Sequence, residues 1–231
     1  MPALVVYGAR GSGSIAVEAA LTLLGLPYEL VEAPTWRQAE ARARVQPVNP
    51  LAQVPALVFP GGEVMTESAA ILIHLADAHP GSGLAPRPGE AGRAQFLRWM
   101  VYVSSAIYAL HWIKPDVRRI GAPPELRAAV VDAVHDRIAS CWKHMDQQLA
   151  PAAYLLGERL TVLDLYVAVV SRFGPWRRRF CEAAPAMARV VQRVDAEPRL
   201  QSFWARRFPL DEGMDAPSPS LSRASDPKET C

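Results

Sequence analysis

The sequence predicts an α/β domain followed by an all-helical domain, and three observations support this. Short apolar runs alternate with amphipathic stretches over the first 80 residues. Prolines and glycines then cluster up to residue 89. Beyond them, apolar residues recur at spacings of three and four to about residue 208, which is typical of helices. We therefore predict an α/β domain (1–80), a linker (81–89), a helical domain (90–210) and a flexible tail (211–231).

The first domain is predicted to follow the order βαβαββα. Its opening strand is the apolar run ALVVY at residues 3–7, and the helix after it ends at Gly25. Pro60-Gly61-Gly62 separates two short apolar runs and predicts a hairpin. The remaining elements are a strand at 28–32, a polar helix at 35–45, hairpin strands at 55–59 and 63–65, and a helix from Glu67 to about Pro80.

The second domain contains two long amphipathic stretches, at 90–114 and 123–149, whose apolar faces suit packing against each other. Residues 162–171 are apolar on all sides, so this helix should be buried. Thr161 and Asp164 have the spacing of a capping box at its start. A further helix is expected between Pro185 and Pro198.

The glycine-rich stretch Gly11–Ala16 (GSGSIA) satisfies the dinucleotide-binding pattern G-x-G-x-x-G/A, and Glu32 follows about twenty residues later. That fold requires parallel strands joined by crossover helices. The tight Pro-Gly-Gly turn instead makes the two strands beside it antiparallel. The α/β part also ends near residue 80, too early for a second nucleotide-binding half. We therefore reject the dinucleotide interpretation.

Composition excludes several other classes of function. The net charge of +2 gives no reason to expect nucleic acid or a membrane as a partner. The first 85 residues hold 4 Arg and 7 Asp or Glu, a charge of −3, which leaves +5 for the remainder and favours a basic surface there. Three widely spaced cysteines indicate neither a disulfide framework nor a zinc ribbon. The histidines show no metal-ligand grouping. With no signal-peptide pattern at the N-terminus, we expect a cytoplasmic protein.

Three motifs carry a family resemblance: NPLAQVPAL at 49–57, ESAAI at 67–71 and TVLD at 161–164. At this spacing the chain resembles a cytosolic glutathione transferase of bacterial type over residues 3–208. The resemblance implies a thioredoxin-like domain followed by a helical domain. It also implies glutathione as co-substrate, no metal, and assembly as a homodimer.

The resemblance assigns a glutathione-binding role to five residues. It implies a cis peptide bond at Pro55, so that the backbone of Val54 can pair with the cysteinyl backbone of glutathione. Gln53 is expected to reach the glycine carboxylate. Ser68, at the start of a helix, suits the γ-glutamyl carboxylate because helix N-termini favour anions. Glu67 would face the ammonium group.

The group that activates the thiol is left open among several candidates. Families of this type place Ser, Tyr or Cys at the start of the first helix. Here Gly11 stands where many bacterial relatives have serine, and Gly13 where the cysteine-using class has cysteine. Ser12 is the first candidate for the catalytic hydroxyl, followed by Ser14 and then Tyr7. Backbone N–H groups of residues 11–13 are the alternative.

The electrophile pocket is expected between the domains, with Tyr102, Tyr108 and Trp112 on the 90–114 helix as its lining. Those side chains equally suit simple packing. Arg10 either adds positive charge near the thiol or is solvated. The run at 176–179 (WRRR) favours anionic substrates if it points into the cleft.

The predicted activity is conjugation of glutathione to an apolar electrophile, as in detoxification; the sequence does not identify the electrophile. One alternative is glutathione-dependent reduction of a disulfide or peroxide. The first domain contains no cysteine, so such a reaction has no protein sulfur to use there. The other alternative is a non-catalytic protein of the same fold that acts through protein contacts.

Overall fold

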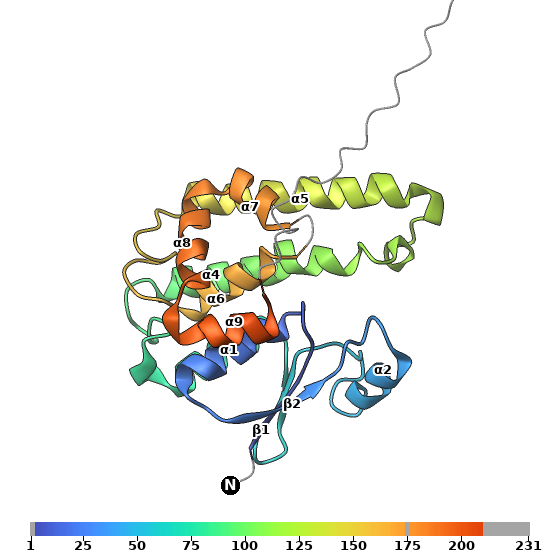
Figure 1. Cartoon of the computed structure of the whole chain (residues 1–231). Coiled ribbons are helices and arrows are strands. Elements are labelled where there is room, and N and C mark those ends of the chain that lie inside the picture. Colours follow the sequence, from blue (N-terminus) through green and yellow to red (C-terminus); the bar gives the residue numbers. More distant parts are fainter. Residues whose placement is uncertain (1–2, 174–175, 210–231) are drawn as a thin grey trace, which may run out of the picture.

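The computed structural model describes residues 3–173 and 176–209. An α/β domain that carries the N-terminus lies below a helical domain in Figure 1. The fold class predicted from the sequence is confirmed: a thioredoxin-like domain precedes an all-helical one. The predicted tail at 211–231 lies outside the described residues.

The sheet contains β1 (Leu4–Gly8), β2 (Tyr28–Glu32), β3 (Ala56–Val58) and β4 (Val64–Thr66), in the order β2-β1-β3-β4. β1 and β2 are parallel, whereas β3 runs antiparallel to both β1 and β4. This confirms the hairpin predicted from the Pro-Gly-Gly turn. The mixed sheet also rules out the parallel dinucleotide-binding arrangement that the glycine pattern raised.

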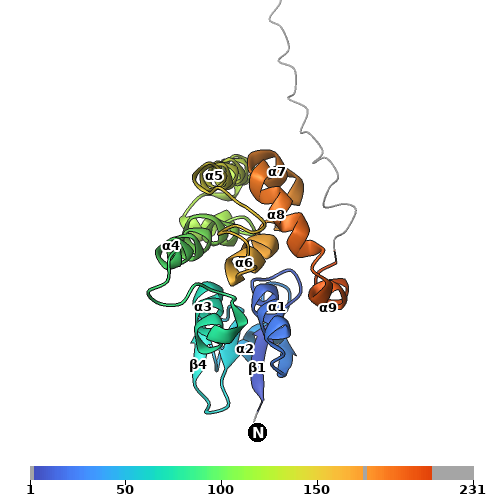
Figure 2. The ribbon, with the colours of Figure 1, turned by 90° about the vertical axis from the view of Figure 1, so that its left-hand side faces the viewer.

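Helices cover both faces of this sheet. α1 (Ser14–Leu24) and α3 (Ser68–Ala78) lie between the sheet and the helical domain in Figure 2. Side chains of β1 alternate, so Val6 is buried in the main core. Tyr7 packs on the opposite face, with α2 (Ala39–Val45) and Ala33.

The helical domain contains α4 (Arg93–Tyr102), α5 (Arg127–Gln148), α6 (Val162–Val170), α7 (Trp176–Ala183), α8 (Pro185–Asp195) and α9 (Gln201–Arg207). Every residue of α6 is buried, as predicted, because this helix contacts α1 and α3 as well as α4 and α8. The predicted capping box is present: the Asp164 carboxylate accepts from the Thr161 N–H at 2.8 Å. α6 therefore joins the two domains.

The long helix predicted over 90–114 is interrupted. α4 ends at Tyr102, a π-helical turn follows at Val103–Ile107, and a 3₁₀ turn spans Tyr108–Trp112. The apolar face predicted for this stretch is nevertheless buried: Phe96, Met100, Val103 and Ile107 are fully enclosed. The changed helical pitch sends the side chains on either side of the π turn in different directions.

A buried charge cluster stabilises the helical domain. Arg172 and Arg177 are 1% and 5% exposed, and each donates to one oxygen of the Asp195 carboxylate at 2.5 Å. The run at 176–179 therefore does not supply a basic cleft wall. Arg177 is buried, while Arg178 and Arg179 pair with acidic residues on the surface.

Replacing Asp195 with alanine should be strongly destabilising, because two buried guanidinium groups would lose their counter-charge. We expect the free energy of unfolding in urea to fall by about 3–5 kcal/mol. Asp136→Ala, which breaks the exposed pair with Arg179, should cost less than about 1 kcal/mol. Equal losses in the two variants would contradict this account of the cluster.

Candidate functional site

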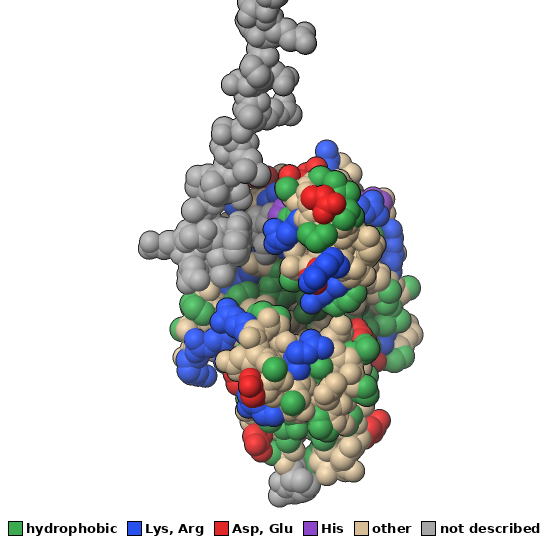
Figure 3. All heavy atoms as spheres, turned by 90° about the vertical axis from the view of Figure 1, so that its right-hand side faces the viewer, with side chains coloured by type: hydrophobic (Ala, Val, Ile, Leu, Met, Phe, Trp, Pro, Cys, Tyr) green, Lys and Arg blue, Asp and Glu red, His purple; other side chains and the backbone are tan. Residues whose placement is uncertain are grey.

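The candidate site lies where the N-terminal ends of α1 and α3 face the helical domain. On this side of the molecule, Figure 3 shows the surface hollowed between the two domains, with Lys and Arg side chains around the hollow. The register of the hairpin pairs Ala56 with Thr66, which brings the Val54-Pro55 bond close to Glu67 and Ser68. The predicted binding residues on these two segments are thus neighbours in space.

Ser68 is the first residue of α3 and is only 4% exposed. Its hydroxyl donates to the Tyr166 hydroxyl of α6 at 3.1 Å. Glu67, which precedes it, is exposed and has a φ of 65°, a conformation that costs a residue with a side chain roughly 1–3 kcal/mol. The first N–H groups of α3 have no acceptor within the helix, so they can bind a carboxylate.

The Val54-Pro55 peptide bond is cis, as the resemblance implied. Val54 is half-buried and packs beside Tyr7, while the Gln53 side chain is exposed. Asn49 fixes the segment, since its side-chain amide donates to the Gln53 carbonyl at 2.9 Å. The backbone here is positioned to pair with an extended peptide.

The two candidate serines of the loop before α1 both point inward. Ser14 is fully buried, and its hydroxyl donates to the Glu18 carboxylate at 2.9 Å. Its close approach to β1 requires glycine at position 8, where a Cβ would lie 2.5 Å from the Ser14 oxygen. The Ser12 hydroxyl lies 2.7 Å from the Ala9 carbonyl oxygen and 2.9 Å from the Ser14 hydroxyl oxygen. Both of these acceptors belong to the loop, so the Ser12 hydroxyl donates its hydrogen within the loop. Tyr7, on the opposite face of the sheet, does not join them.

The Glu18 carboxylate, which accepts the Ser14 hydrogen bond, is also paired with an arginine of α9. Glu18 is fully buried in α1, and Arg207 of α9 donates to it from Nε at 2.7 Å. Arg207 also contacts Glu32 at 2.9 Å, and Glu32 in turn accepts the Arg10 backbone N–H at 3.0 Å. The Arg10 side chain is exposed. The sequence analysis missed this network because its members are up to 189 positions apart.

Tyr108 reaches the same loop from the helical domain. Its oxygen accepts the Gly13 backbone N–H at 2.9 Å. Its ring contacts Tyr166 edge-on, with centroids 6.2 Å apart, and lies 5.5 Å from Phe173. Tyr102 does not join this group, because its hydroxyl donates to the Cys141 carbonyl of α5 at 3.3 Å.

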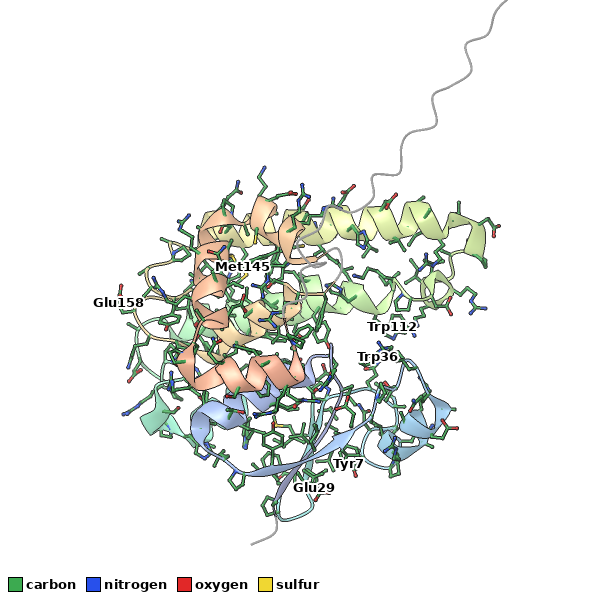
Figure 4. The ribbon with its side chains drawn as sticks, viewed as in Figure 1. Tyr7, Glu29, Trp36, Trp112, Met145 and Glu158 are labelled. Carbon is green, nitrogen blue, oxygen red and sulfur yellow. The ribbon has the colours of Figure 1, made fainter. Side chains whose placement is uncertain are left out.

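Two exposed tryptophans lie on the same side of the molecule. Trp112 is 46% exposed and is covered in part by the Arg119 guanidinium, 4.9 Å from its ring. Trp36, in the loop after β2, is 49% exposed. Figure 4 shows them opposite each other, one on each domain. Trp36 was not predicted, although a lone aromatic side chain in the polar stretch 34–46 could have indicated it.

His111 packs behind Tyr108 and against Phe173, with ring centroids 5.5 Å apart in the second pair. Burial, helped by the nearby Lys114 and His135, lowers the pKa of His111 to about 3. Its buried Nε2 has no hydrogen-bond partner among the described residues. A neutral imidazole therefore forms part of the aromatic lining.

The described residues contain no group of three or more His, Cys, Asp or Glu side chains arranged to hold a metal ion. Over the same part of the chain, no helix is long and apolar enough to cross a membrane.

Comparison with known proteins places both domains in one family. Residues 6–83 match the glutathione S-transferase N-terminal domain, and residues 124–207 match the glutathione S-transferase C-terminal domain. Over 204 residues the chain is 31% identical to the uncharacterised GST-like protein YncG of Escherichia coli strain K12. That match covers 87% of this chain and 97% of YncG.

Two solved structures are similar over most of the chain. A sphingomonad glutathione S-transferase complexed with glutathione is 26% identical, with a TM-score of 0.72, and the match covers 86% of this chain and 96% of that one. A glutathione transferase homologue from Sulfitobacter with bound glutathione has a TM-score of 0.77 over 89% and 98% of the two chains. Its identity of 24% supports a common fold only.

His111 should make the protein sensitive to acid. Its pKa is lower in the folded than in the unfolded chain, so its contribution to stability is complete above about pH 6.5 and is lost as the pH falls. His111→Phe keeps a ring against Phe173 but cannot be protonated. Between pH 7 and 5, its free energy of unfolding should fall by roughly 2 kcal/mol less than that of the parent. Exposed His74→Phe is the control, and parallel pH profiles for His111→Phe and the parent would contradict the prediction.

Proposed function

The chain belongs to the glutathione S-transferase family, and from this premise we propose that it binds glutathione, stabilises the thiolate and transfers it to an apolar electrophile. One observation carries the proposal: the cis Val54-Pro55 backbone lies beside the strained turn at Glu67 and the start of α3 at Ser68. Ser68 and Glu67 suit the γ-glutamyl end of the tripeptide, and the backbone at Val54 suits its cysteinyl backbone.

In the proposed binding mode, the γ-glutamyl carboxylate accepts from the Ser68 N–H at the positive end of α3. It also accepts from the Ser68 hydroxyl, whose hydrogen turns from Tyr166 to the carboxylate when glutathione binds. The ammonium group faces Glu67. The cysteinyl backbone pairs with Val54, and the glycine carboxylate lies near Gln53. The similar sphingomonad structure, which contains glutathione, supports glutathione as the ligand.

The thiol then points toward the N-terminal end of α1. A free thiol has a pKa near 8.5, so its reactive thiolate form is scarce at neutral pH unless the protein stabilises it. Ser12 lies in the loop at this end of α1, and its hydroxyl donates to the Ala9 carbonyl. The buried Ser14 hydroxyl donates to Glu18 and so stabilises the loop. The thiolate attacks the electrophilic carbon, a C–S bond forms, and the leaving group departs with its electron pair.

The hollow between the domains suits an apolar acceptor with a flat ring. Trp112 approaches it from the helical domain and Trp36 from the α/β domain. Tyr108 was predicted to line the same pocket and contacts Gly13 in the loop before α1. Tyr102 is left out of this pocket because its hydroxyl bonds to α5. The surrounding basic side chains favour an electrophile that carries or develops negative charge.

The two alternatives remain distinguishable from conjugation. Reduction of a disulfide or peroxide would draw all its sulfur from glutathione, since the first cysteine of the chain is Cys141. A protein that acts only through contacts would have no use for the strained turn at Glu67. Turnover of an activated aryl chloride, compared with that of a hydroperoxide, separates all three possibilities.

We further propose that the protein is a cytoplasmic homodimer. Leu97 and Val101, four residues apart on α4, are 37% and 58% exposed, and Leu51 and Val64 of the α/β domain are also exposed. Figure 2 shows α4, α3 and β4 along one side of the molecule. Exposed apolar side chains on α4 and on β4, which lie on this side, suit contact with a second copy of the chain.

Calorimetric titration with glutathione tests the binding site. The parent protein should bind, and Ser68→Ala should bind roughly tenfold or more weakly, because a hydrogen bond to a charged group is lost. Ser140→Ala, on an exposed position of α5, is the matched control. Failure of the parent protein to bind glutathione would remove the proposed function, and unchanged affinity in Ser68→Ala would remove the role of Ser68.

Light scattering coupled to size exclusion tests the dimer. Val101→Lys places a charge within the proposed interface and should shift the protein to monomer. Leu126→Lys changes an equally apolar residue, 50% exposed, outside the α4 face and should leave the dimer intact. A monomeric parent protein would contradict the proposal.

A further inference from the structure

The Tyr108 hydroxyl occupies the space that a side chain at position 13 would fill. A Cβ built on Gly13 would lie 2.6 Å from the Tyr108 oxygen and 2.8 Å from its Cε1. Gly13 itself has φ −63° and ψ −14°, which any residue adopts. Space for Tyr108, rather than backbone conformation, therefore requires glycine here.

Within the described part of the chain, Tyr108 is also the hydroxyl at this loop whose hydrogen has no acceptor. Its oxygen accepts from the Gly13 N–H at 2.9 Å, and no hydrogen bond that it donates is found among residues 3–173 and 176–209. The hydrogens of Ser12 and Ser14 are engaged inside the loop. The backbone N–H groups of residues 12–14 also have partners: the Ala9 carbonyl, the Tyr108 oxygen and the Ser12 hydroxyl, respectively.

We propose that Tyr108 is a catalytic residue whose hydroxyl donates the hydrogen bond that stabilises the bound glutathione thiolate. This inference rests on the proposed function, and it moves Tyr108 from the electrophile pocket to the reacting sulfur. The thiol proton passes to solvent, the electron pair stays on sulfur, and Tyr108 remains protonated throughout.

Two features make Tyr108 a suitable donor. The Gly13 N–H, at the positive end of α1, polarises the hydroxyl that it donates to, which strengthens the hydrogen bond that Tyr108 can give in turn. Burial also raises the pKa of Tyr108 to about 12, so the phenol keeps its hydrogen wherever glutathione is a thiolate. Through this hydroxyl, the positive end of the α1 dipole can stabilise the negative charge on the sulfur.

The rest of the cluster holds the ring in place. Tyr166 and Phe173 contact it from α6 and the segment after α6. Tyr166 also accepts from Ser68, the residue proposed to bind the γ-glutamyl end. Ser68, at the γ-glutamyl end, and Tyr108, at the thiol, are therefore linked through Tyr166 of the helical domain.

Tyr108→Phe tests the inference because it keeps the ring and removes the hydroxyl. We measure the ultraviolet absorbance of the bound thiolate as a function of pH, and glutathione affinity by calorimetry at a pH where the thiol is protonated. The bound thiol pKa should rise by roughly one to two units, with affinity within about twofold of the parent. Tyr154→Phe, on a loop remote from α1, should change neither quantity.

Gly13→Ala supplies a second, independent variant. Its methyl group should displace the Tyr108 ring, so the thiol pKa should rise as in Tyr108→Phe. The double variant should show no further rise, because both changes remove the same hydrogen bond. If Gly13→Ala does not fold, Tyr108→Phe alone decides.

The outcomes separate this inference from the proposed function. A parent protein that does not bind glutathione overturns both. Glutathione binding with an unchanged thiol pKa in Tyr108→Phe overturns the role of Tyr108 alone. A rise in Ser12→Ala but not in Tyr108→Phe also overturns it and assigns the hydrogen bond to Ser12.

Discussion

The hydrogen bond from the Gly13 backbone N–H to the Tyr108 hydroxyl joins the two domains at the point where the chemistry is proposed. It requires a residue without a side chain at position 13 and a tyrosine from a segment 95 positions later. The proposed binding surface for the γ-glutamyl end lies in the first domain, whereas the proposed donor to the sulfur belongs to the second. The proposed activity therefore requires correct packing of the two domains.

A second contact with the helical domain, through α9, also stabilises the loop before α1. Arg207 of α9 neutralises the buried Glu18, and Glu18 accepts the Ser14 hydroxyl. A buried carboxylate is tolerated only when it is paired and hydrogen-bonded, so this network fixes where the loop can lie. The helical domain thus holds the loop through two contacts, Tyr108 with Gly13 and Arg207 with Glu18.

Much of the fold could be predicted because its signals are local. The Pro-Gly-Gly turn fixed the antiparallel hairpin, and the spacing of Thr161 and Asp164 indicated the start of α6. The segments around Val54 and Ser68, to which we assign glutathione binding, were found through motifs that are contiguous in the sequence. Even the glycine-rich stretch, once separated from the dinucleotide pattern, was correctly taken to open a helix.

What the sequence left open depends on contacts between distant residues. The apolar periodicity of 90–114 continues through the π turn without Gly or Pro. The sequence therefore gave no indication that the side chains of Tyr102 and Tyr108 would point in different directions. The two serines looked like ligands for a thiol because their partner Glu18, and its partner Arg207, could not be placed near them. Gly13 was taken as a departure from a cysteine-bearing loop; the structure shows a tyrosine hydroxyl in the space of the missing side chain.

A crystal structure of the protein with glutathione tests the central claim most directly, because it locates the sulfur. The account predicts the γ-glutamyl carboxylate at the start of α3 and the sulfur within hydrogen-bond distance of the Tyr108 oxygen, with both loop serines still turned inward. A sulfur bonded to Ser12, with Tyr108 displaced from Gly13, would contradict it.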